Sequence, residues 1–274
     1  MDHGLCHERL ISLARFFIDQ SQISGDSVAI TGADAHHLRD VLRLKPGDVI
    51  AVLDGANREY CVRLDTVDSG HAEGSILSNC LRQTEPHALL TLAQCLPKGD
   101  KMELVLQKGT EIGYTAFIPV VSERSIVKLD ADRAAKKGER WRKIVQSAAE
   151  QSGRARLPEV HSLHSWQQLC DRFADFDLVL LPWEGEEAAG LKETLKAKNI
   201  GAGVGAGAGV GAGASNGTSI LVIIGPEGGL AVSEVEKARS CGALTVSLGP
   251  RILRTETAGL ACGVAVLYES GDFS

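Results

Sequence analysis

The chain has few aromatic residues, which make up only 4% of its 274 positions. Long apolar runs are missing as well, because none approaches the roughly 20 residues that a membrane-spanning helix needs. The first ten residues, MDHGLCHERL, carry acids and lack the apolar centre of a secretory signal. These absences argue against base recognition on aromatic platforms. They predict a soluble, intracellular protein, cytoplasmic or organellar.

Paired cysteines are also lacking. The seven cysteines are scattered without a Cys-x-x-Cys pair or a histidine at metal-ligand spacing. This predicts free thiols in a reducing compartment and no bound metal. The net charge of −6 argues against a basic coat, although basic residues cluster between positions 98 and 156. Because local patches meet phosphates whatever the net charge, nucleic-acid binding stays open.

Residues 15–85 alternate short β-like runs with the turn sequences KPGD, DGAN and DSG. One helix-like stretch, DAHHLRDVLR, interrupts them, with Asp34 as its expected N-cap. This pattern predicts a small, mostly antiparallel β-barrel that carries one helix. The TEPHA segment around Pro86 is typical of a linker.

From residue 89 onwards strand-like and helix-like segments alternate, which predicts an α/β domain over 86–274 with a mainly parallel sheet and helices on both faces. The expected helices span 100–113, 132–152, 185–197, 234–241 and 255–268. Ligands of such sheets bind beyond the carboxyl ends of the strands. The candidate site segments are therefore LLPWEG, IIGPEGGL and LGPRILRTETA.

A glycine- and alanine-rich tract over 200–217 separates the helix at 185 from the strand at 219. Glycine loses much backbone entropy when ordered and alanine buries little area, so a flexible surface insertion is expected. No strand leads directly into the tract and no Lys-Ser/Thr pair follows its glycines. It therefore lacks the context of a nucleotide-binding loop.

The IIGPEGGL segment combines a fixed bend at Pro226 with two glycines, Gly228 and Gly229, which let main chain approach a ligand. Glu227 in this turn either caps backbone donors or faces a ligand. Ser233 and Glu236 have the spacing of a capping box that starts the next helix.

The LGPRILRTETA segment sets two arginines before an apolar helix. Thr255 and Glu256 suit a helix N-terminus, where hydroxyls cap and carboxylates favour the dipole. Arg251 and Arg254 do not, because cations there meet the positive end of the dipole. Their position calls for an anionic or carbonyl-rich partner.

Together with LPKGDKMELVLQKGTEIG, SERSIVK and EQSGRARLPEV, these segments closely resemble the ribosomal RNA small subunit methyltransferase E family. That family belongs to the SPOUT class of S-adenosylmethionine-dependent RNA methyltransferases. The resemblance runs from about residue 15 to residue 268. The chain departs from the family at the Gly/Ala insertion and at residues 1–14, an N-terminal extension expected to be disordered.

The resemblance implies a PUA-like barrel for RNA binding and a methyltransferase domain tied in a deep trefoil knot, an exception to the usual rule against threaded chains. It also implies a homodimer with the pocket near its interface. The methyl donor is expected among the loops 180–184, 224–230 and 247–257. The residues implied to contact the donor are Leu180, Leu181, Pro182, Ile224, Gly225, Pro226, Glu227, Gly228, Gly229, Leu248, Gly249, Ile252, Leu253, Thr255 and Ala258.

The implied reaction is methylation of N3 of one uridine in small-subunit ribosomal RNA. Arg254 is the leading candidate to stabilise the uracil anion, Arg251 the second, and Glu256 comes before Glu227 as proton acceptor. A simple helix cap for Glu256 and solvated surface positions for the lysines remain alternatives. The candidate RNA contacts are Arg39, Arg43, Lys98, Lys101, Lys108, Arg124 and Arg154. Two rivals stay open: a SPOUT enzyme acting on a ribose hydroxyl or on transfer RNA, and a catalytically silent RNA-binding relative.

Overall fold

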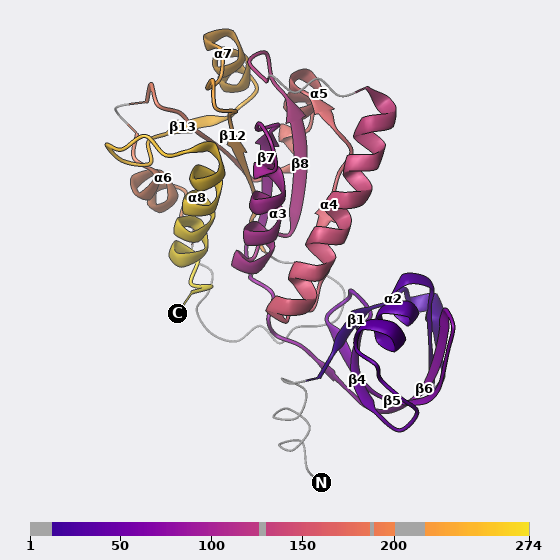
Figure 1. The fold of residues 1–274 in the computed structure, drawn as a ribbon. Helices are drawn as coiled ribbons and strands as arrows, with labels where there is room; N and C mark the ends of the chain where they lie inside the picture. The colour runs from indigo at the N-terminus through magenta and orange to yellow at the C-terminus, as the bar shows by residue number, and fades with distance from the viewer. Residues whose placement is uncertain (1–12, 126–129, 187–188, 201–216, 274) are drawn as a thin grey trace. The chain divides into compact units, whose positions relative to one another are not determined.

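The computed structural model describes residues 13–125, 130–186, 189–200 and 217–273. The chain divides into two compact units, and each is described by itself (Figure 1). The first unit runs to Glu85 and also includes Ala149–Leu157, and the second comprises the rest of the chain. Of the predicted N-terminal extension the structure describes residues 13 and 14, and of the Gly/Ala insertion residues 200 and 217. The rest of both segments lies outside the described residues.

The first unit is built on a six-stranded sheet in the order β1-β4-β5-β6-β3-β2. Only β1 and β4 pair in parallel, so the predicted antiparallel character is confirmed. Alternate side chains such as Val28, Ile50 and Val62 face one apolar core, as the two-residue period of a strand requires. The strands are β1 Arg15–Phe17, β2 Ile23–Ser24, β3 Ser27–Thr31, β4 Val49–Leu53, β5 Arg58–Asp68 and β6 His71–Leu81.

The helix of this unit begins earlier than predicted. It consists of α2 (Gly32–His36) followed by a π-helical turn, η2 (His37–Val41); a short 3-10 turn, η1 (Gln20–Gln22), precedes it in the chain. The N-cap is Thr31, and Asp34 lies inside the first turn without capping it, so that prediction is wrong. Burial raises the pKa of the Asp34 carboxyl, partly offset by His37.

The second unit is built on a parallel sheet in the order β10-β8-β7-β12-β11-β13, with β9 paired to β8. Every pairing among these strands is parallel, which confirms the predicted sheet. The strands are β7 Leu89–Cys95, β8 Ala116–Val121, β9 Glu159–Val160, β10 His164–Ser165, β11 Leu178–Pro182, β12 Ser219–Ile224 and β13 Leu244–Val246.

Helices cover both faces of this sheet. On one face of the sheet an apolar core joins the strands to α3, α4, α6 and α8. On the opposite face a second apolar core joins the strands to α5 and α7. Figure 1 shows α3 and α8 in front of the sheet. Among the described residues no helix has the length and apolarity to cross a membrane. The helices are α3 Lys101–Ile112, α4 Ala131–Ser152, α5 Trp166–Asp171, η3 Phe173–Asp175, α6 Leu191–Ala197, α7 Val232–Ser240 and α8 Thr255–Glu269.

The predicted capping box at Ser233 and Glu236 is wrong. Helix α7 begins two residues earlier, after its N-cap Ala231, and the buried Glu234 accepts a hydrogen bond from the Ala231 amide at 3.0 Å. Glu234 also accepts from the Glu123 amide at 2.8 Å. A carboxylate that satisfies two backbone donors fixes the start of the helix better than the exposed Ser233 does.

Candidate cofactor pocket

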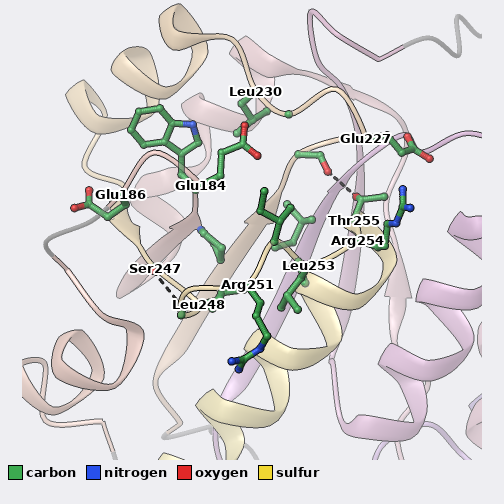
Figure 2. Close-up of a pocket in the computed structure, with 18 of the residues that line it drawn as sticks. Glu184, Glu186, Glu227, Leu230, Ser247, Leu248, Arg251, Leu253, Arg254 and Thr255 are labelled. Atoms are coloured by element: carbon green, nitrogen blue, oxygen red, sulfur yellow. Dashed lines mark hydrogen bonds between the residues drawn. The ribbon is translucent and has the colours of Figure 1, made fainter.

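A cavity of about 800 Å³ lies at the carboxyl ends of β11, β12 and β13 (Figure 2). Its walls come from residues 182–184, 224–227, 229–230 and 247–255, with Glu186 and Ala258. These are the three strand ends that the sequence singles out. Their convergence follows from the parallel sheet, in which the carboxyl ends of adjacent strands share one edge.

The predicted donor-contacting residues line this cavity with three exceptions. Leu180 and Leu181 are fully buried in β11, where they contribute to the two opposite apolar cores. Gly228 faces Arg124, whose Nη1 donates to the Gly228 carbonyl at 3.0 Å. These three residues are not among those that line the cavity, and their contact with the donor stays a prediction.

Several lining residues were missing from the predicted set: Trp183, Glu184, Glu186, Leu230, Ser247 and Pro250. All but Glu186 fall within the three expected loops. Glu186 accepts hydrogen bonds from Thr245 Oγ1 at 2.6 Å and from Arg239 Nη2 at 2.8 Å. The same guanidinium lies 5.3 Å from the centroid of the Trp183 ring. Nothing local in the sequence signals this tertiary network.

Two glycines keep main chain at the cavity wall. Gly229 has φ of +67° and Gly249 has φ of +98°, a region that side chains disfavour. A Cβ on Gly229 would also sit 3.1 Å from a Glu184 carboxylate oxygen. The close approach of backbone at Gly229 therefore depends on glycine, as the sequence predicts.

Thr255 connects two strand ends to helix α8. Its hydroxyl donates to the Gly225 carbonyl at 2.6 Å and accepts from Gln94 Nε2 at 2.9 Å. The N-cap of α8 is Arg254, and no side chain caps it. The predicted capping role of Thr255 is therefore wrong, because its hydroxyl is committed to the ends of β12 and β7.

Arg251 and Arg254 both line the cavity and are both exposed. Figure 2 shows them on different sides of the loop, with Arg254 on the side of Glu227 and Arg251 extending the opposite way. Neither guanidinium forms a hydrogen bond or ion pair with the residues that the structure describes. Both are therefore available to a ligand.

Glu227 and Glu256 share one partner. The Lys101 ammonium lies 3.0 Å from Glu227 Oε1 and 3.2 Å from Glu256 Oε2. The Lys98 amide also donates to both Glu227 oxygens, at 3.1 and 3.3 Å. Glu256 does not line the cavity, since it points to Lys101 at the start of α3. The structure therefore assigns both carboxylates an ionic contact that the sequence alone did not predict.

The charges of this cluster are fixed by its contacts. Burial raises the pKa of Glu227, but hydrogen bonds from its own amide, Lys101 and the Lys98 amide outweigh this and leave that pKa below its ordinary value. Contact with Glu227 raises the pKa of Lys101 despite some desolvation, with Glu256 adding to the effect. Glu227 is thus ionised and Lys101 protonated at neutral pH. A carboxylate in this state is a weak proton acceptor.

Comparison with known proteins decides the family. A model of the RNA methyltransferase domain matches residues 84–267, and one of the RNA methyltransferase PUA domain matches residues 30–77. Ribosomal RNA small subunit methyltransferase E of Bacillus subtilis is 38% identical over 261 residues, which cover 94% of this chain and 97% of that protein. The chain belongs to the ribosomal RNA small subunit methyltransferase E family. The family predicted from the sequence is thereby confirmed.

Other members of the methyltransferase E family agree. The protein of that name from Synechocystis is 35% identical over 89% of this chain and 74% of its own length. The crystal structure of the enzyme from Neisseria gonorrhoeae, bound to S-adenosyl methionine, has a TM-score of 0.77 and 34% identity. It covers 92% of this chain and 96% of its own. The similarity therefore includes both units and not one domain alone.

The predicted RNA contacts of this methyltransferase E family member have diverse surroundings. Arg39 pairs with Asp40 and Lys108 with Glu111, each at the protein surface, while Arg43 and Lys98 are exposed. Arg154 is a correction: it is 4% exposed and its guanidinium contacts both Glu85 oxygens, at 2.6 and 3.0 Å. A buried, bidentate arginine stabilises the first unit and does not face RNA.

Proposed function

We propose that the chain transfers the methyl group of S-adenosylmethionine to N3 of a uridine in small-subunit ribosomal RNA. The coarser part, a small-subunit ribosomal RNA methyltransferase that uses S-adenosylmethionine, follows from family membership. The observation that supports methylation at uridine N3 is Arg254, a cation at the wall of the cavity that is unpaired among the described residues.

The cavity suits the methyl donor in size and chemistry. Its volume of about 800 Å³ falls in the range of small-molecule sites. Main chain at Gly229 and Gly249 offers carbonyl oxygens to a purine, and Leu248 and Leu253 offer apolar surface. Glu184, which has no partner among the described residues, provides a carboxylate for a cationic amino group. We therefore assign the donor to these three strand-end loops.

When bound, the donor supplies an electrophilic methyl group on a positively charged sulfur. A uridine N3 keeps its proton at neutral pH, so the protein must favour loss of that proton. The Arg254 guanidinium can donate in a fixed geometry to O2 or to O4, and so stabilise the charge that spreads from N3 onto these oxygens while N3 stays open to the methyl group. Positioning of the base in line with the donor supplies a further part of the rate enhancement. Arg251 is assigned to RNA phosphate or to the same base.

The contacts of the two carboxylates modify one earlier expectation. Glu256 and Glu227 were the candidates for proton acceptor, yet each is committed to Lys101. We therefore assign them to the organisation of the site. Loss of the proton to water, with the resulting anion held by Arg254, agrees better with this arrangement.

The RNA-facing parts are also proposals. We assign residues 15–85 to a PUA-like RNA-binding domain, with Arg39 and Arg43 as contacts, and 86–274 to the methyltransferase domain. A trefoil knot through the three loops, a homodimer with the pocket near its interface and a cytoplasmic location follow from the resemblance. The exposed Val264 and Tyr268 on α8 suit packing against a second copy. Light scattering of the purified protein tests the dimer.

Incubation with labelled donor and either small ribosomal subunits or naked RNA tests the function. We expect one methylated uridine, with the methyl group on N3 when the nucleotide is isolated and mapped. Methylation of a ribose hydroxyl or of transfer RNA would support a different SPOUT activity. Donor binding without any methylation would support a silent relative.

A further inference from the structure

Arg254 has no ionic partner among the described residues, although the carboxylates of Glu256 and Glu227 belong to the same part of the site. Glu256 follows it by two residues, and Glu227 lies on the same side of the pocket in Figure 2. Guanidinium and carboxylate groups form strong bidentate pairs when both are available. Without another cation, Arg254 would therefore be expected to form an ion pair with one of these carboxylates and not to bind a base.

Lys101 prevents this pairing because it forms ion pairs with both carboxylates. Its ammonium meets Glu227 at 3.0 Å and Glu256 at 3.2 Å, and its side chain is 33% exposed. Glu227 is further occupied by the Lys98 amide. The cluster of one cation and two anions keeps a single net negative charge. Removal of Lys101 would double that charge beside Arg254.

The backbone around Arg254 is anchored by the same group of contacts. Thr255 is bonded to Gly225 and Gln94, and Glu256 is held by Lys101. Arg254 precedes these two anchored residues with extended ψ of 152°. The arginine is therefore fixed at its Cα while its guanidinium stays unpaired among the described residues. An anchored backbone with an unpaired guanidinium is the arrangement expected of a residue that binds the substrate base.

We propose that Lys101 is a positioning residue that occupies Glu227 and Glu256 and thereby leaves Arg254 free to bind the substrate base. This inference rests on the proposed function of Arg254. It replaces the expected RNA contact of Lys101, because its ammonium already forms ion pairs with two carboxylates. Lys101 acts through Arg254 and does not itself touch the base.

The test is a charge-compensation series in the full chain: Lys101→Met, Lys101→Arg, Glu256→Gln and the double variant Lys101→Met/Glu256→Gln. We measure kcat and KM for the RNA substrate, the dissociation constant of S-adenosylmethionine by calorimetry, and the melting temperature. Lys101→Gln replaces Lys101→Met if the latter does not fold. Lys192→Met, at an exposed position of α6, is the control with the same charge change.

We expect Lys101→Met to lower kcat about 100-fold, the size of losing one transition-state cation, with little change in donor affinity. Lys101→Arg should stay within about tenfold of the wild type, because it retains the charge. The double variant restores the net charge of the cluster and should regain about tenfold in kcat over Lys101→Met. Lys192→Met should behave as the wild type.

The proposal is overturned if the double variant is no more active than Lys101→Met, or if Lys101→Met matches the wild type. A rise in RNA KM with unchanged kcat would also overturn it, in favour of a phosphate contact. These outcomes differ from failure of the proposed function, in which the wild-type chain itself would not methylate uridine N3.

Discussion

In the parallel sheet of the second unit, charged side chains have opposite roles at the amino ends of the strands and at their carboxyl ends. These two sides are called the amino edge and the carboxyl edge of the sheet. At the amino edge, acids are closed onto backbone donors: Asp177 accepts from the Ser219 amide and hydroxyl, each at 2.8 Å. Asp272 accepts from the His87 amide at 2.7 Å and from Ser270 Oγ at 2.7 Å. At the carboxyl edge, Arg254 has no partner among the described residues.

This difference separates stability from function within one sheet. A carboxylate that accepts hydrogen bonds from backbone amides fixes a strand end and so stabilises the fold. An unpaired arginine at a cavity contributes little to folding and is free to stabilise charge on a substrate. Substitutions at the two edges should therefore change different measurements.

The largest expected effect is at the carboxyl edge. Arg254→Ala should lower kcat by about 10²–10³-fold, because it removes the leading cation assigned to the uracil anion. Donor binding and melting temperature should change little, since the side chain is exposed and forms no hydrogen bond or ion pair with the described residues. Labelled-donor assays on small ribosomal subunits and calorimetry with S-adenosylmethionine measure the two effects.

A matched charge control sharpens this prediction. Arg172→Ala removes a surface arginine that pairs with Asp175, away from the residues that line the cavity. It should leave kcat unchanged. Retained activity in Arg254→Ala, or an equal loss in both variants, would remove the catalytic assignment of Arg254.

The division into strands, helices and candidate loops could be read from the sequence. Alternating apolar runs predict a parallel sheet, and a parallel sheet brings its carboxyl ends to one edge, so the cavity-lining loops follow. The odd cations Arg251 and Arg254 were visible because they oppose a helix dipole. Those features depend on neighbours close in the chain.

The sequence was less informative wherever a partner lies far along the chain. Lys101 is 126 and 155 positions from its acids, and nothing in its local pattern separates it from a solvated lysine. Arg154 stands in a motif that suggested an RNA contact, yet its guanidinium is buried in an ion pair with Glu85. Helix α5 was also missed. It has a capping box at Ser165 and Gln168, but its six residues are too few to show a helical period in the sequence.

Thr255→Val breaks the carboxyl edge without changing its charge. The variant loses the bond to Gly225 and leaves the Gln94 amide without its hydroxyl acceptor. Leaving a buried polar group unsatisfied costs about 1–3 kcal/mol. We expect donor affinity to fall about tenfold, equivalent to about 1.4 kcal/mol, because the Gly225 wall loosens. Calorimetry measures this, and Thr257→Val, at an exposed position two residues later, is the control expected to bind donor normally.

Asp272→Ala tests the amino edge. Its carboxylate is 4% exposed and joins the chain after α8 to the segment before β7. Loss of these bonds should lower the free energy of unfolding by about 1–3 kcal/mol. The kcat at 25 °C should equal that of the wild type. A fall in kcat with unchanged stability would show that the two edges are not separable in this way.

The smallest expected effect is a dependence on acid. Burial raises the pKa of Asp272, but its hydrogen bonds, led by the His87 amide, outweigh burial and hold that pKa below its ordinary value. Hydrogen bonds from Ser219 lower the pKa of Asp177 likewise. A carboxyl with a lowered folded-state pKa stabilises the fold above its ordinary pKa, and this contribution is lost as the pH falls through the folded-state value. Urea unfolding from pH 7 to pH 3 should therefore show a shallower decline for Asp177→Asn and Asp272→Asn than for the wild type, since neither variant has a carboxyl to protonate. Parallel curves would mean that these acids do not link the amino edge to pH.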